Sequence, residues 1–75
     1  MKIKMGSVES TYLASVGYDE KTSTMVVRFT DGAVIHYYKV SPRTYRAVVF
    51  AKSPGEKFTE LVRDRYNYTV MKQAA

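Results

Sequence analysis

The stretch from Thr24 to Lys39 constrains the fold most, because its pattern predicts two β-strands joined by a tight turn. From Thr24 to Thr30, apolar side chains recur at every second position, which places them on one face of a strand. Asp31-Gly32 then separates this run from a second apolar run, Ala33 to Lys39. Aspartate–glycine between apolar runs is a strong hairpin signal, because both residues tolerate positive φ. The sequence therefore predicts an antiparallel hairpin.

A further strand is predicted ahead of the hairpin. Ser10 to Tyr18 alternates imperfectly, with Leu13 and Val16 among its bulky residues, and the polar stretch from Asp19 to Ser23 follows as a turn. Three consecutive strands joined by short turns form a meander, which has one apolar face to cover. In the last strand, Ile35 and Tyr37 are expected to face that core.

Two helix starts follow the strands. Ser41-Pro42 and Ser53-Pro54 each place a serine at the N-cap position and a proline at the first helical position. Ser53 and Glu56 also have the spacing of a capping box, in which each side chain can satisfy an amide of the other. Two short helices are therefore expected.

The apolar spacing within the two helices predicts how they pack. The first helix has a wide apolar stripe, which predicts that it is well buried: Tyr45, Ala47, Val48, Val49 and Phe50. The second has residues at i, i+3, i+4 and i+8: Phe58, Leu61, Val62 and Tyr66. The predicted fold class is therefore α+β, a three-stranded antiparallel meander followed by two short helices packed on one face. The stretch from Asn67 to Met71 is expected as a short extended tail that packs back on the sheet.

Length and charge narrow the classes of function. With 75 residues the chain makes a single domain, and its net charge of +5 favours acidic partners. It has no cysteine, which fits a reducing compartment, and no apolar run long enough for a membrane span. We therefore expect a cytoplasmic protein that is not embedded in a membrane.

No catalytic constellation can be recognised in the sequence. His36 is the only histidine, and no further ligands have the spacing of a zinc site. Ser41 and Ser53 are explained as N-caps, and the carboxylates Glu56 and Glu60 lie on a polar helix face. The sequence predicts no enzyme, no metal and no cofactor.

Once these elements are placed, a family pattern emerges along the chain. The residues that carry it are Tyr18-Asp19, Met25 to Phe29, Asp31-Gly32, Tyr37, Val40, Tyr45, Ala51 to Gly55, Phe58, Val62 and Tyr66. This pattern resembles the KTSC domain, a family named after the C-terminal extension of some lysyl-tRNA synthetases and found also as stand-alone bacterial or phage proteins. Two departures are Ile35, where the family usually has a tyrosine, and Ser41, where it usually has a proline. The resemblance runs from about Ser10 to Tyr66. Along the whole chain we expect an N-terminal arm over 1–9, a single KTSC-like domain over 10–71 and a frayed tail over 72–75.

A segment rich in tyrosines and cations suggests the function. No acidic residue occurs from Ala33 to Ser53, and rings and cations placed together can stack on a base and hold a phosphate. The candidate nucleic-acid or anion-binding residues are Lys39, Arg43, Arg46, Lys52, Tyr38 and His36. The leading hypothesis is a small, basic, non-catalytic module that binds RNA, which the attachment of the family to a tRNA synthetase also implies.

Other hypotheses are open at this point. An adaptor or small phage or bacterial inhibitor would bind a protein partner through a sheet edge or through exposed tyrosines such as Tyr12 and Tyr38. A third hypothesis is sequestration of an anionic nucleotide by an oligomer. Neither helix shows a long heptad pattern, so the oligomeric state stays open as well.

Overall fold

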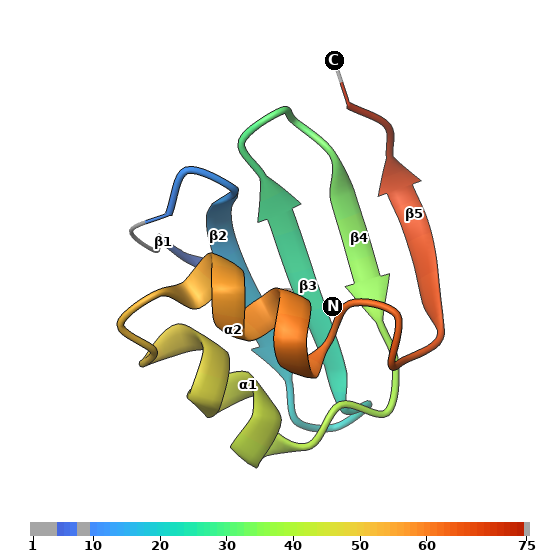
Figure 1. Cartoon of the computed structure of the whole chain (residues 1–75). Coiled ribbons are helices and arrows are strands. Elements are labelled where there is room, and N and C mark those ends of the chain that lie inside the picture. Colours follow the sequence, from blue (N-terminus) through green and yellow to red (C-terminus); the bar gives the residue numbers. More distant parts are fainter. Residues whose placement is uncertain (1–4, 8–9, 75) are drawn as a thin grey trace.

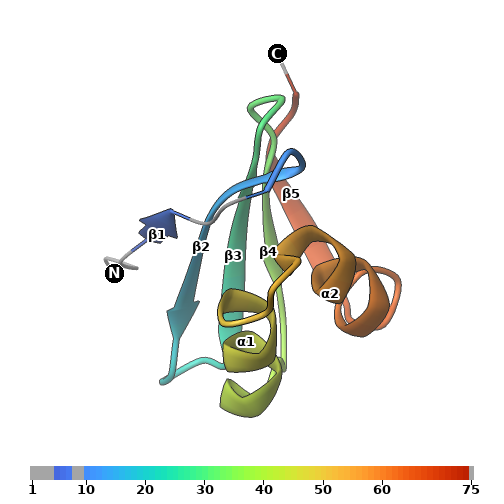
Figure 2. The same ribbon diagram turned by 60° about the vertical axis from the view of Figure 1, so that its left-hand side comes forward.

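The computed structural model describes residues 5–7 and 10–74 and shows a five-stranded antiparallel sheet with two helices (Figure 1). The elements in chain order are β1 (Met5–Ser7), β2 (Leu13–Asp19), β3 (Thr24–Phe29), β4 (Val34–Tyr37), α1 (Pro42–Val49), α2 (Pro54–Leu61) and β5 (Tyr68–Lys72). The strands lie in the order β1-β2-β3-β4-β5. Figure 2 shows β1 beside β2 at one side of the sheet and β5 at the other.

The α+β class is confirmed, but the prediction of a three-stranded sheet is wrong. β2, β3 and β4 form the predicted meander, and one further strand pairs at each edge. β1 lies within the stretch expected to be an arm, the rest of which is outside the described residues, and Met5 pairs with Gly17. β5 includes the segment expected as an extended tail, and Tyr68 pairs with Tyr37. The chain thereby gives both edges of the meander a hydrogen-bonded neighbour.

The hairpin between β3 and β4 lies where it was predicted, but its turn is different. The Gly32 N–H donates to the Phe29 carbonyl at 3.0 Å, and the Phe29 N–H donates to the Ala33 carbonyl at 2.9 Å. Gly32 has a φ of 98°, whereas Asp31 is not among the residues with positive φ. This is a three-residue loop with glycine in the left-handed position. The Asp31 carboxylate accepts the Ala33 N–H at 3.0 Å, so both residues of the pair have a role in the turn.

The core lies between the helices and one face of the sheet. Its fully buried side chains come from β2, β3, both helices and the adjoining loops: Leu13, Val16, Met25, Val27, Val40, Val48, Phe58 and Val62. The Phe58 ring centre lies 5.7 Å from that of Phe29 and 5.4 Å from that of Tyr37, both edge-on. Phe58 therefore joins α2 to two strands. Ile35 packs against this core from β4, as predicted.

The helix ends differ from the predictions in three places. Ser41 caps α1 as predicted, since its Oγ accepts the Thr44 N–H at 3.2 Å. Ser53 makes no side-chain cap on α2, so the predicted capping box is wrong. Phe50, expected in the core, is 80% exposed at the C-cap of α1. The second helix ends at Leu61, ahead of Tyr66, and Asp64 follows with a φ of 63°, a conformation that does not continue a right-handed helix.

A close approach between the segment before β2 and α2 explains the glycine in the first turn of α2. A Cβ on Gly55 would lie 2.9 Å from the Ser10 Oγ. That oxygen accepts the N–H groups of Tyr12 and Leu13 and so holds the entry to β2. Gly55 thus permits the contact between the first residues of the domain and α2. Neither helix of the described part of the chain could span a membrane.

Candidate binding site on the first helix

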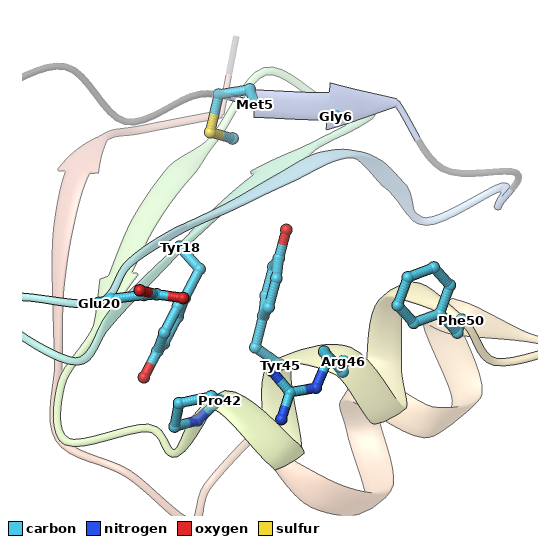
Figure 3. A pocket seen from close by; sticks show the side chains of 8 residues that line it. All are labelled: Met5, Gly6, Tyr18, Glu20, Pro42, Tyr45, Arg46 and Phe50. Carbon is cyan, nitrogen blue, oxygen red and sulfur yellow. The ribbon is translucent and has the colours of Figure 1, made fainter.

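A hollow of about 500 Å³ lies between α1, the end of β2 and β1, and we refer to it as the α1 hollow (Figure 3). Its lining residues are Met5, Gly6, Tyr18, Glu20, Pro42, Tyr45, Arg46 and Phe50. The lining is mainly apolar and aromatic, with one cation from α1 and one carboxylate from the turn after β2. A concave site with a few charged groups on an apolar wall suits a ligand that combines a flat ring with a charge.

Two tyrosines form the wall of the α1 hollow. The rings of Tyr18 and Tyr45 stack with centres 4.9 Å apart and planes inclined by 17°. Figure 3 shows their hydroxyls at opposite ends of the stack. The Tyr18 hydroxyl donates to the carbonyl of Val40, a fully buried residue in the loop before α1. This bond and the stack fix α1 against β2, so the wall is preformed.

The outer side of α1 presents cations and one ring together. Arg43, Arg46 and Phe50 are all exposed and lie at i, i+3 and i+7, which places them on the same side of the helix. Phe50 stands at the far end of α1 in Figure 3, and both Arg46 and Phe50 line the α1 hollow. The helix thus offers a solvent-exposed ring beside two guanidinium groups.

The structure separates the six residues selected from the sequence. Arg46 lines the α1 hollow, and Arg43 is exposed on the same helix. Tyr38 and Lys39 line a different hollow, of about 380 Å³, with Asp64 to Asn67. Lys52 lies beyond the end of α1, beside the start of α2. Within residues 5–7 and 10–74, therefore, only Arg46 of the six lines the α1 hollow.

His36 lies on the other face of the sheet. Its partners across the strands are Val26 in β3 and Thr69 in β5. Side chains alternate between faces along a strand, and its neighbours Ile35 and Tyr37 pack against the core. His36 therefore faces away from the helices and from the α1 hollow.

Two residues of the α1 hollow, Tyr45 and Phe50, were assigned to the buried stripe of the first helix by sequence reasoning. Tyr18 and Tyr45 do pack against the core, but each leaves part of its ring in the hollow. Phe50 could have been recognised from its spacing. It falls on the helix face of Arg43 and Arg46, whereas Val48 falls on the opposite, buried face.

A second groove, of about 290 Å³, lies on the inner face of the sheet near β5. It is lined by Tyr12, Phe29, Ile35, Tyr37, Arg63, Asp64, Tyr68 and Val70. Burial raises the pKa of the Tyr37 phenol from 10.0 to about 12; Tyr12 and Tyr68 raise this pKa further, and the Arg63 cation opposes the shift. Tyr37 therefore stays neutral in the folded protein at a pH where a free tyrosine is ionised.

This shift predicts a loss of stability in alkali. Because the pKa of Tyr37 is higher in the folded chain, the unfolded chain releases this proton first. The contribution to the free energy of unfolding is complete below pH 10 and is lost as pH rises from 10 toward 12. Urea unfolding followed by circular dichroism over this range should show the decline, and Tyr37→Phe should decline less. An equal decline in both proteins would contradict the assignment to Tyr37.

The sequence and the fold of this chain were both compared with those of known proteins. The family model of the KTSC domain matches residues 9–66. A protein from Tsukamurella paurometabola is 34% identical over 62 residues, which cover 83% of this chain and 92% of that protein. A lysine–tRNA ligase from Nostoc punctiforme is 27% identical over 60 residues, which cover 80% of this chain and only 11% of the ligase. The crystal structure of a KTSC domain protein from Yersinia pestis has a TM-score of 0.90 and 20% identity, and the match covers 95% of this chain and 100% of that one.

Proposed function

The chain belongs to the KTSC domain family, and we propose that it is a non-catalytic module that binds single-stranded RNA on the outer side of α1. The observation that carries this proposal is the exposed face formed by Arg43, Arg46 and Phe50 beside the tyrosine wall of the α1 hollow. Single-stranded nucleic acid is commonly bound by cations that follow the phosphates and rings on which bases stack.

The charges around α1 support an anionic ligand. Among residues 5–7 and 10–74, one ion pair forms, between Lys57 and Glu60 on α2. The cations of α1 are therefore available for phosphates. Lys39 and Lys52 flank the helix at its two ends and are also exposed. An eight-residue helix is about 12 Å long, so a strand that runs along α1 would pass Arg43 and Arg46, with Lys39 and Lys52 near its two ends.

The α1 hollow gives a base a place beside this charged face. The Phe50 ring is 80% exposed, so it can stack on a base without prior rearrangement. Glu20 lies on the wall of the same hollow and offers a carboxylate to the amino group of a base. The similarity to part of a lysine–tRNA ligase supports RNA as the ligand. We also propose the cytoplasm as the location, which the absence of cysteine supports.

The proposal predicts a binding affinity that depends on salt and on the two arginines of α1. For single strands, the slope of log K (the association constant) against log salt is about −0.7 per neutralised phosphate, so Arg43→Ala with Arg46→Ala should make the slope less steep by about 1.4. Fluorescence anisotropy of a labelled single-stranded RNA of mixed sequence, measured in a series of salt concentrations, gives this slope.

A matched control separates this site from net charge alone. Arg28→Ala with Lys72→Ala removes the same amount of charge from exposed positions outside α1, one in β3 and one in β5. This double variant should keep a slope close to that of the unmodified protein. Equal effects of the two double variants would argue against a site on α1, and the absence of binding even at low salt would rule out the proposal.

A protein ligand is the second candidate, favoured by the composition of the same surface. Phenylalanine, tyrosine, methionine and arginine are enriched at protein interfaces, and all four line the α1 hollow. Affinity capture from lysate with and without nuclease distinguishes the two candidates. A discrete partner that persists after nuclease and is lost with Phe50→Ala would support a protein ligand over RNA.

A further inference from the structure

β5 forms a free edge of the sheet whose backbone groups can be assigned (Figure 1). The Tyr38 N–H donates to the Asn67 carbonyl at 2.9 Å, so this is a hydrogen-bonded pair of the ladder. Such pairs alternate with non-hydrogen-bonded pairs in an antiparallel ladder. In the register of β4 and β5, Thr69 directs its N–H and C=O toward β4, whereas Tyr68 and Val70 direct theirs away from the sheet.

The features that usually prevent strand pairing are confined to one end of this edge. β5 contains no proline and no acidic residue, and its single charge, Lys72, is its last residue. Its exposed side chains include Tyr68 at 56% and Met71 at 57%. The irregularity between Val34 and Ile35 affects only the end of the strand near Lys72. An exposed apolar edge of this kind is a template for another strand.

The sequence of β5 is complementary to itself in one register. In an antiparallel pair centred on Thr69, Tyr68 faces Val70 of the second copy, and each such pair can exchange both of its backbone hydrogen bonds, because these groups point outward. An aromatic residue opposite a β-branched one stabilises a sheet, and threonine opposite threonine does so as well. The two Lys72 side chains lie six positions apart, about 20 Å, so they do not repel each other strongly.

We propose that two copies of this chain form a dimer by antiparallel pairing of their β5 strands, with the two-fold axis at Thr69. The inner-face groove of each copy reaches this edge through Tyr68 and Val70. Pairing joins the two grooves and covers apolar surface that is exposed in the single chain. The self-complementary register selects a second copy over an unrelated extended peptide. The dimer does not depend on RNA binding.

The first test uses a proline at the free edge. Val70→Pro removes an N–H that points away from β4, so the hydrogen bonds between β4 and β5 stay intact. The dimer, in contrast, loses one N–H donor from each of its two Tyr68–Val70 pairs. Sedimentation velocity should show a concentration-dependent dimer for the unmodified chain and a monomer for the folded variant. A dissociation constant of about 1 mM corresponds to an association free energy of only about 4 kcal/mol. A chain that stays monomeric up to about 1 mM therefore overturns the proposal. A dimer that persists in Val70→Pro overturns it too.

The second test fixes the register and does not rely on the proline variant. The sequence has no cysteine, so a single introduced cysteine reports one position. Thr69→Cys places the two Cα atoms about 4.5 Å apart in a non-hydrogen-bonded pair, which suits a disulfide. Met71→Cys, the matched control, places them four positions apart, about 14 Å, which is too far. Mild oxidation should cross-link Thr69→Cys only. The reverse result, or no cross-linking of Thr69→Cys, contradicts this pairing.

Discussion

Replacing Phe58 with alanine is expected to lower the free energy of unfolding by about 3–5 kcal/mol. The side chain is fully buried, and its ring meets those of Tyr12, Phe29 and Tyr37 within 6.0 Å. The variant loses the transfer free energy of the ring and leaves a cavity between α2 and the sheet. A domain of 75 residues has a total free energy of unfolding of about 4–11 kcal/mol, so the variant should lose a large share of its stability. Urea denaturation followed by circular dichroism measures the loss.

Phe50→Ala is the matched control for this prediction. It removes the same atoms from a ring that is 80% exposed, so the free energy of unfolding should change by about 0.5 kcal/mol or less. The comparison isolates burial from the chemistry of the substitution. Similar losses for the two variants would show that Phe58 is not the centre of the core.

The same Phe50→Ala variant is expected to weaken RNA binding by roughly 5- to 150-fold. Stacking of one base on an aromatic side chain is worth about 1–3 kcal/mol, which corresponds to that range of dissociation constants. Because Phe50 contributes little to the core, the effect on binding should occur without loss of the fold. Fluorescence anisotropy at constant salt measures the change, and Phe50→Tyr should bind nearly as well as the unmodified protein, because it keeps the ring.

The salt dependence distinguishes stacking from charge in this variant. Phe50→Ala should leave the slope of log K against log salt unchanged, because no phosphate contact is removed. Arg43→Ala with Arg46→Ala should instead change the slope. An unchanged affinity for Phe50→Ala would mean that no base stacks on this ring.

The strongly patterned parts of the fold could be predicted from the sequence. The alternation in Thr24 to Thr30, the Asp31-Gly32 turn and the serine cap of α1 each have a local physical cause, and each lies where it was expected. The edge strands were harder to predict. β1 has only three residues, and every residue of β5 is exposed, so neither carries the apolar alternation of a half-buried strand.

The candidate site could be predicted only in part. The absence of acidic residues around α1 pointed to its cations, but local patterns do not show which cations meet a ring in space. Phe50 was wrongly assigned to the core because it extends the wide apolar stripe of the first helix. The position of the helix end, where Phe50 is the exposed C-cap, was not considered. Tyr66 extended the helical spacing beyond Leu61 because it packs against the core after the helix has ended.

The place of β5 in the sheet has a consequence for the order of folding. Short connections link the two strands of every other neighbouring pair. The connection from β4 to β5 is much longer, because it comprises residues 38–67 and contains both helices. Closing this long connection costs more entropy than closing a hairpin, and the exposed residues of β5 return little burial energy. β5 is therefore expected to pair with β4 only after the β2–β3–β4 meander has formed, and its departure would open the inner-face groove while the meander stays folded.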